Sequence, residues 1–258
     1  MGLEYVEFGS AVRLSILFVG LTWALILFVR PILRFWLRRQ GGINEIVGIA
    51  ISSFSVFYGI LLGLLAVAAY QNVEEAKSTV KSETTAIFSL YKNLSHYPEP
   101  LRTDGQRLLV TYTKYLIDRV WPEQALGIID RKSDDILSAL QDNLQLFDPD
   151  GETQNLIHGE TMTQFYALTQ AKALREAQVK VRIDSVLWWL VVVGVLVNIA
   201  LIVLLDVRIL LHLTIGGLVI FYLAMTIYAI SALDEPFAGA VRIGPGDYET
   251  VLKKMQPD

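Results

Sequence analysis

Cysteine is absent from this chain of 258 residues, and histidine occurs only three times. Without cysteine there is no disulfide, no thiolate metal ligand and no cysteine nucleophile. The histidines lie at positions 96, 158 and 212, which are 62 and 54 residues apart, so the close spacing typical of a zinc site is missing. No nucleophile motif surrounds a serine, and Gly244-Pro245-Gly246 is a turn rather than a phosphate-binding loop. The sequence therefore predicts no enzyme, no metal site and no cofactor.

Charged residues are also scarce, at 19% of the chain against about 25% in a typical soluble domain. Four stretches contain no Asp, Glu, Lys or Arg: residues 14–29, 46–70, 186–205 and 209–233. A helix needs about 20 apolar residues to cross the hydrocarbon core of a bilayer. The last three stretches reach that length, and the first reaches it when residues 8–13 are added. A purely soluble protein is therefore excluded.

The segment between the second and third stretches has a different composition. Residues 71–185 carry 13 Lys+Arg and 17 Asp+Glu, as expected for a part in water. The net charge of −4 resides in this segment, so nucleic-acid binding has no electrostatic support.

These patterns predict an all-α integral membrane protein with four transmembrane helices, arranged as two hairpins that flank a helical soluble insert. The expected parts are a first transmembrane hairpin (8–70), the insert (71–185), a second transmembrane hairpin (186–233) and a C-terminal tail (234–258). Helix is the expected spanning element, because backbone amides in lipid must be satisfied within the segment. The first hairpin should turn from Arg30-Pro31 to Gly41-Gly42, and the second within residues 206–208.

Helix boundaries in the insert can be predicted from breakers and capping residues. No breaker lies between Gly63 and Pro98, so the second span should continue as one helix beyond the charge-free stretch. Thr103 is expected to open the next helix with a capping box, and Ser133 is expected to cap a short helix. A long helix from Thr153 should lead into the third span.

The second span has two distinctive faces. One carries small residues at a spacing of three or four, and these are candidates for close helix packing: Ser52, Ser55, Gly59, Gly63 and Ala66. This face serves either ordinary packing between helices or an oligomer in which the second spans surround a central axis. A neighbouring stripe holds the candidate pore and gate residues, Ser53, Phe57, Ile60 and Leu64, whose apolar members would form a constriction.

Two further sites contain carboxylates. Glu83 interrupts an apolar helical series, so it should be paired, with Arg175 or Lys172 as its partner. After the fourth span comes a boundary motif, Asp234-Glu235-Pro236-Phe237. Its carboxylates either cap the tail or bind a cation. A calcium site would need Asp247 and Glu249 as well, so we expect no metal there.

Several segments resemble the bestrophin-like family of bacterial membrane proteins. They are Asn44-Glu45-Ile46-Val47-Gly48, the run from Phe57 to Leu62, Ala76, Val80, Glu83, Leu90-Tyr91, Tyr112, Trp121-Pro122 and the stretch from Leu233 to Gly239, colinear from Asn44 to Tyr248. Bestrophins are pentameric anion channels with this hairpin–insert–hairpin plan, a pore lined by the second span and a Ca²⁺ clasp after the fourth. The resemblance implies a homo-oligomeric channel for small inorganic ions such as chloride. The acidic run of the clasp is missing here, since only Asp247 and Glu249 follow Phe237.

The expected location is the bacterial inner membrane, with the lipid bilayer and other copies of the chain as partners. Both termini and the insert should lie on one side. The short first turn carries Arg30, Arg34, Arg38 and Arg39, which by the positive-inside rule favours a cytosolic turn. Lys77, Lys81, Lys172, Arg175, Lys180, Arg182 and Arg242 flank the spans on the insert side and favour a cytosolic insert, as the resemblance also implies. We predict a cytosolic insert. The alternative to a channel is a non-conducting scaffold or sensor whose insert binds a partner.

Overall fold

A computed structural model of the chain describes residues 6–37, 42–239 and 241–256. In these ranges every regular element is a helix, so the all-α prediction is confirmed. The elements are α1 (Val6–Leu37), α2 (Ile43–Leu94), α3 (Leu101–Tyr115), the π-helical turn η1 (Leu116–Val120), α4 (Trp121–Gln124), α5 (Lys132–Gln145), α6 (Glu152–Gln178), α7 (Ser185–Val203), α8 (Ile209–Leu233) and α9 (Gly246–Met255).

Among the described residues, four helices are long and apolar enough to cross a membrane. They are α2, α7, α8 and the part of α1 from Gly9 to Val29. Their positions match the four charge-free stretches, which confirms the predicted spans. The helix α2 is unbroken over 52 residues, well beyond the length that a span requires.

Two predicted helix boundaries are wrong. The first hairpin was expected to turn from Arg30-Pro31, but α1 passes through Pro31 and ends at Leu37. Proline is tolerated inside membrane helices, where neighbouring groups satisfy the freed carbonyl. Residues 38–41, the rest of that turn, lie outside the described residues. Helix α6 does not run into the third span; it ends at Gln178, and Asp184 begins α7 by accepting a hydrogen bond from the amide of Val186.

The predicted caps of α3 and α5 are also wrong, because the N-cap positions are occupied by Pro100 and Arg131, and a carboxylate just before each accepts hydrogen bonds from the first turn. Helix α3 begins at Leu101, and Glu99 accepts hydrogen bonds from the amide and hydroxyl of Thr103. Helix α5 begins at Lys132, and Asp130 accepts from the amide of Ser133. In both cases the residue expected to cap the helix donates its backbone amide to a carboxylate that precedes the helix.

The chain divides into two compact units. The first, called here the transmembrane unit, contains residues 1–71 and 182–234, and the second, the insert unit, contains residues 72–181 and 235–258. The two predicted hairpins thus form one unit. Of the C-terminal tail expected over residues 234–258, residues 235–258 are grouped with the insert.

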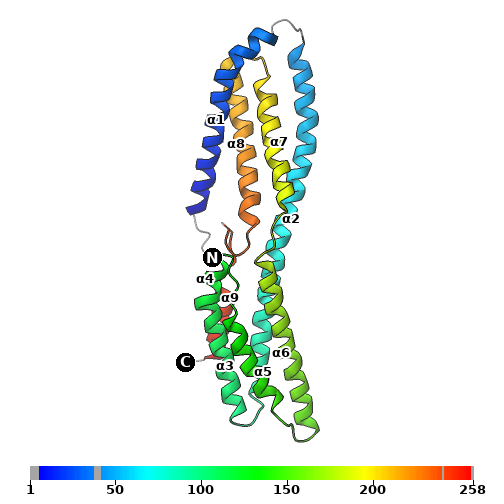
Figure 1. Cartoon of the computed structure of the whole chain (residues 1–258), viewed down its shortest axis with the longest axis vertical. Helices are drawn as coiled ribbons and strands as arrows, with labels where there is room; N and C mark the ends of the chain where they lie inside the picture. Colours follow the sequence, from blue (N-terminus) through cyan, green and yellow to red (C-terminus); the bar gives the residue numbers. More distant parts are fainter. Residues whose placement is uncertain (1–5, 38–41, 240, 257–258) are drawn as a thin grey trace. The chain divides into compact units, whose positions relative to one another are not determined.

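In the transmembrane unit, α1 lies beside α8, and α7 lies beside the first part of α2 (Figure 1). The buried residues form two clusters. One joins α2, α7 and α8 through Tyr58, Val191 and Ile230. The other joins α1, α7 and α8 through Ile26, Ile199 and Ile220. A polar contact adds to these. The side-chain amide of Asn44 donates to the carbonyl of Asp206 at 2.8 Å and accepts from its amide at 2.8 Å.

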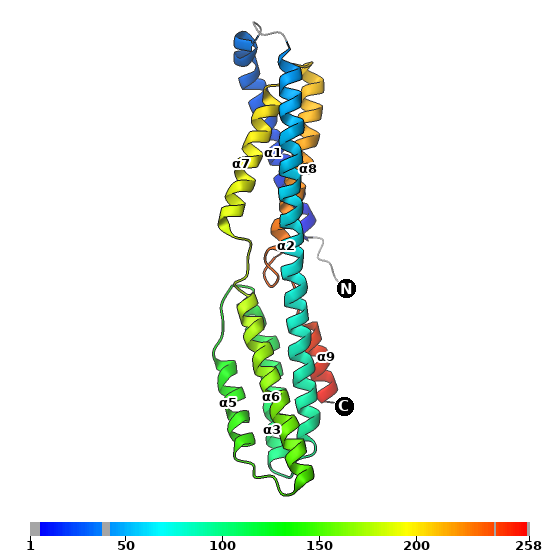
Figure 2. The same cartoon turned by 90° about the vertical axis from the view of Figure 1, so that its right-hand side faces the viewer.

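In the insert unit, the second part of α2 packs with α3, α5, α6 and α9 around one apolar core (Figure 2). Ile87, Leu90, Leu109 and Leu140 are fully buried there. Helix α9 is fastened by Tyr91, whose hydroxyl donates to the carbonyl of Met255 at 2.8 Å. Because this core surrounds Glu83, it also sets the environment of a buried charge.

Candidate functional site

One face of α2 is used for packing inside the transmembrane unit. Tyr58 is buried, and its hydroxyl donates to the carbonyl of Val191 in α7 at 2.8 Å. Leu62, Leu65 and Ala69 continue the buried face toward the insert end of the span. The approach of α7 is so close that a Cβ at Gly194 would lie 2.0 Å from the ring of Tyr58. This face was not identified from the sequence. Tyr58 is the signal that could have indicated it, because a buried tyrosine needs an acceptor for its hydroxyl.

The candidate pore and gate residues occupy a different face of α2. Ser53, Phe57, Ile60 and Leu64 are all exposed in the single chain, and Phe57 has 74% of its side chain accessible. They therefore take no part in the apolar clusters of the transmembrane unit. Such a stripe meets lipid, a pore or another copy of the chain.

The small-residue face is also largely uncovered within the chain. A Cβ added at Gly59 or Gly63 would have no heavy atom of the described residues within 4 Å, other than those of its own helix. Ser52 and Ser55 are exposed, with the Ser52 hydroxyl donating to the carbonyl of Gly48 at 2.9 Å. Ala66 alone is half-buried, at the edge of the cluster around Tyr58. The Gly-xxx-Gly pair thus does not serve packing between described helices of one chain.

Glu83 lies at the centre of a buried charge cluster in the insert unit. The Glu83 and Arg175 side chains both have 0% of their surface exposed, and Arg175 Nε donates to Glu83 Oε2 at 2.6 Å. The hydroxyl of Tyr112 in α3 donates to Glu83 Oε1 at 2.7 Å, and that of Tyr248 in α9 donates to Oε2 at 2.7 Å. The carboxylate therefore connects α2 with three other helices.

The electrostatics of this cluster hold both charges in place. Burial is the largest single effect and would lower the pKa of Arg175, but the Glu83 charge, together with Tyr248 and Tyr112, outweighs it, so the pKa is raised. Burial, and next the Glu83 charge, raise the pKa values of Tyr112 and Tyr248 well above 10.0. Both tyrosines are therefore neutral donors and Arg175 is a cation at neutral pH. The Nη1 atom of Arg175 is buried without a hydrogen-bond partner in the described residues.

Lys172, the other partner considered for Glu83, has different contacts. Its ammonium group pairs with Asp134 and, at 2.9 Å, with Glu176. Burial would lower its pKa, but these two carboxylates outweigh the burial and raise it. Of the two candidates, Arg175 is the residue in contact with Glu83.

The boundary motif contributes to both units, and each part makes local contacts. In the transmembrane unit, Asp234 is buried and accepts from the amide of Ile183 at 2.6 Å and from the indole of Trp188 at 3.1 Å. In the insert unit, Phe237 packs edge-on against Trp121, with 5.7 Å between the ring centroids. The carbonyls of Glu235 and Pro236 accept hydrogen bonds from the amides of Gly239 and Ile243, at 2.7 Å and 2.8 Å.

The described part of the chain contains no group of three or more side chains placed to hold a metal ion. Asp247 and Glu249, the additional acids that a calcium site would need, lie in the first turn of α9. Negative side chains are favourable there because the helix dipole is positive at its N-terminal end.

The chain resembles known proteins in sequence and in fold. A profile of the Bestrophin-like domain matches residues 16–248. A variant of a bacterial bestrophin homologue from Klebsiella pneumoniae superposes with a TM-score of 0.70 at 15% identity, covering 95% of this chain and 99% of that one. A structure of the same homologue, phased with zinc, superposes with a TM-score of 0.69 at 13% identity, covering 93% of this chain and 96% of that one. A variant of a membrane protein superposes with a TM-score of 0.71 at 13% identity, covering 95% of this chain and 99% of that one. No curated protein sequence matches.

Proposed function

Because the chain belongs to the bestrophin-like family, we propose that it assembles as a homo-oligomer in the bacterial inner membrane and conducts small anions. In this proposal α2 from each copy lines a central pore. Chloride is the simplest such anion, and a pentamer is the assembly that the family resemblance implies.

One observation carries the proposal: α2 leaves two adjacent faces uncovered while its third face packs in the chain. The uncovered apolar stripe contains Phe57 and Ile60, and the uncovered small face contains Gly59 and Gly63. Exposed small residues allow the backbones of neighbouring copies to approach closely. If neighbouring copies pack through the small face in this way, the apolar stripe with Phe57 and Ile60 turns toward the axis of the assembly.

The chemistry of such a pore follows from the charge-free stretch 46–70. No fixed ring of charge lies within it, so selectivity would depend on pore width, hydroxyls and helix dipoles. Ser52, Ser53 and Ser55 are exposed and supply the hydroxyls. At the insert end, Lys77 and Lys81 are exposed cations near the mouth, although Lys77 also pairs with Glu74 at 2.8 Å. Phe57, Ile60 and Leu64 would form a collar that opposes ion passage until it widens.

Conductance of the purified protein in planar bilayers tests this proposal. Phe57→Ala and Ile60→Ala should raise the anion current, because each removes bulk from an apolar constriction. Matched controls lie on α1: Phe28 is 77% exposed against 74% for Phe57, and Ile16 is 60% exposed against 56% for Ile60. Phe28→Ala and Ile16→Ala should leave the current unchanged.

If the parent and both α2 variants pass no current with a range of anions and cations, although correctly assembled, the channel proposal fails. The scaffold or sensor function would then replace it. If the α1 controls raise the current as much as the α2 variants, the pore is lined by another helix.

Assembly is tested separately by native mass measurement. Gly59→Leu or Gly63→Leu should reduce the proportion of intact oligomer, because a bulky side chain separates backbones in contact. Gly20 is exposed on α1 with equally open space and provides the control, Gly20→Leu. Unchanged oligomers in both α2 variants would place the interface elsewhere.

The proposed cytosolic insert is tested by reporter fusions. Reporters at residues 120 and 256 should be active in the cytosol, and one at residue 40 should be active only outside it. The reverse pattern would show that the insert lies outside the cytosol. Reporters at residues 120 and 256 that disagree would contradict the topology with four spans.

A further inference from the structure

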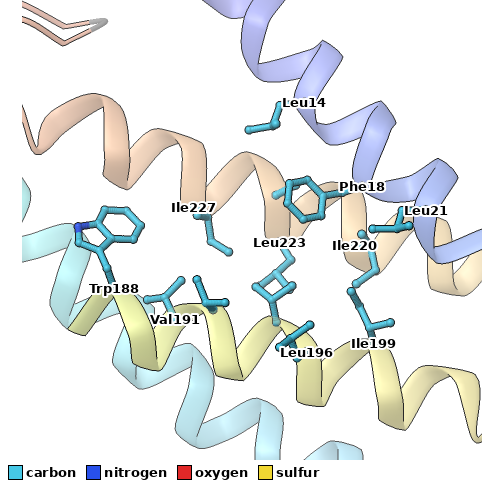
Figure 3. A pocket seen from close by; sticks show the side chains of 13 residues that line it. Leu14, Phe18, Leu21, Trp188, Val191, Leu196, Ile199, Ile220, Leu223 and Ile227 are labelled. Atoms are coloured by element: carbon cyan, nitrogen blue, oxygen red, sulfur yellow. The ribbon is translucent and has the colours of Figure 1, made fainter. Parts of the chain in front are cut away.

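An apolar pocket of about 230 Å³ lies within the transmembrane unit, between α1, α7 and α8 (Figure 3). All of its 13 lining residues are apolar. Trp188 and Ile227 lie at one end, and Leu21, Ile199 and Ile220 lie at the other. The only polar group of these side chains, the indole N–H of Trp188, donates to Asp234. The pocket therefore offers no hydrogen bond to a ligand.

The pocket is elongated along the helices. From Trp188 to Ile199 it follows α7 for about 16 Å, and from Ile220 to Ile227 it follows α8 for about 10 Å, at 1.5 Å per helical residue. It also opens sideways, because Val192 and Leu196 line it and remain exposed. A long groove with carbon walls and a lateral opening fits a flexible hydrocarbon chain better than a compact polar molecule.

We propose that this groove binds one acyl chain of a membrane phospholipid. All three helices that form it are candidate spans, so the medium that reaches its opening is hydrocarbon. An empty space here would cost the lining residues their dispersion contacts. An apolar cavity of about 150 Å³ is already sufficient to bind benzene in another protein. The groove is larger, and an acyl chain fills it without leaving a polar group unsatisfied.

The position of the headgroup follows from the direction of the groove. The Trp188 end of the groove is near the start of α7 at Ser185, just before the charge-free stretch 186–205 begins. On α1, Arg13 directly precedes the lining residue Leu14 and is exposed. A guanidinium group binds phosphate well. The phosphate of the bound lipid is therefore placed at this end, within reach of Arg13.

Lipid retention tests the proposal. The protein is reconstituted in vesicles of phosphatidylethanolamine and phosphatidylglycerol, extracted into detergent, washed and analysed for bound lipid by native mass spectrometry. The parent should keep one phospholipid per chain. Val192→Trp should lower retention at least about tenfold, because the indole fills the groove. Leu196→Trp is a second filling variant if the first folds poorly.

Val193 provides a matched control. It follows Val192 on α7 and is 49% exposed, compared with 46% for Val192, but it does not line the groove. Val193→Trp should retain lipid as the parent does. Arg13→Gln should reduce retention of phosphatidylglycerol at least about threefold, because a charge-assisted contact with the headgroup is lost.

Four outcomes would overturn the proposal. They are a parent that retains no lipid, equal retention by the Val192 and Val193 variants, retention of free fatty acid in place of phospholipid, and loss of the oligomer specifically in Val192→Trp. The last would show that another copy covers the groove. Equal retention by Arg13→Gln and the parent would overturn the headgroup position.

Discussion

The hydroxyl of Tyr248 should contribute measurably to the stability of the insert unit. Tyr248 is fully buried, and its hydroxyl donates to Glu83 Oε2 at 2.7 Å. A hydrogen bond to a charged group contributes about 1.5–3 kcal/mol. In a protein of this size, each kcal/mol shifts the unfolding midpoint by about 2–4 °C. Tyr248→Phe should therefore lower the midpoint by about 3–12 °C.

Replacing the carboxylate should cost more than removing one of its donors. Glu83→Gln leaves the buried guanidinium of Arg175 without an anion, a change that costs about 3–5 kcal/mol in buried pairs. Arg175→Met leaves the carboxylate unpaired at a similar cost. The double variant removes both charges together, so it should be less destabilised than the sum of the two single variants.

Thermal unfolding followed by circular dichroism in detergent at neutral pH measures these effects. Tyr166 provides the control, because it is exposed on α6, and Tyr166→Phe should change stability by no more than about 0.5 kcal/mol. Equal midpoints for Tyr248→Phe and Tyr166→Phe would refute the hydrogen-bond argument. Additive costs in the double variant would refute the claim that Glu83 and Arg175 stabilise the fold as a pair.

Three other predictions concern neighbouring features. Stability should fall as pH rises above about 10, because Tyr112 and Tyr248 lose their protons at a lower pH in the unfolded chain than in the fold, where burial raises their pKa values. Tyr248→Phe should make this fall shallower in a pH series of unfolding midpoints. Gly194→Ala should destabilise the transmembrane unit by about 1–3 kcal/mol, because its Cβ would overlap the Tyr58 ring; Gly20→Ala, with open space at its Cβ, is the control in the same thermal assay. Asp234→Asn should cost about 1–3 kcal/mol, because the Ile183 amide and the Trp188 indole donate to different carboxylate oxygens, and one of these would become an NH2 donor. An unchanged midpoint would contradict this.

The spans could be predicted from sequence because a bilayer imposes one simple requirement, length without charge. Helix ends were harder, since they depend on a few competing side chains. Thr103 and Ser133 have the right chemistry for capping, but Glu99 and Asp130 lie earlier and accept from their backbone amides. Proline usually ends a helix because it lacks an amide donor, yet α1 continues through Pro31. In membrane helices other groups can satisfy the carbonyl that proline leaves free, so the rule is weaker there.

The faces of α2 show a different limit. Periodicity finds the stripes of a helix but does not assign a partner to each, because in lipid an apolar stripe does not have to be buried in protein. The stripe that packs in the chain contains Tyr58, and the smallest residue opposite it, Gly194, is on another helix. That complementarity joins positions far apart in the sequence, so only the structure reveals it.

The buried charge cluster shows how far a single polar residue can be interpreted. An acidic residue in an apolar series predicts a cation nearby, and Arg175 is in contact with it. A carboxylate has about four acceptor positions, so one cation leaves positions to be satisfied. Tyr112 and Tyr248 satisfy them, but in a periodic pattern each is counted as apolar because its ring is. A carboxylate predicted to be buried therefore implies further donors, and tyrosines at apolar positions of other helices are the first to consider.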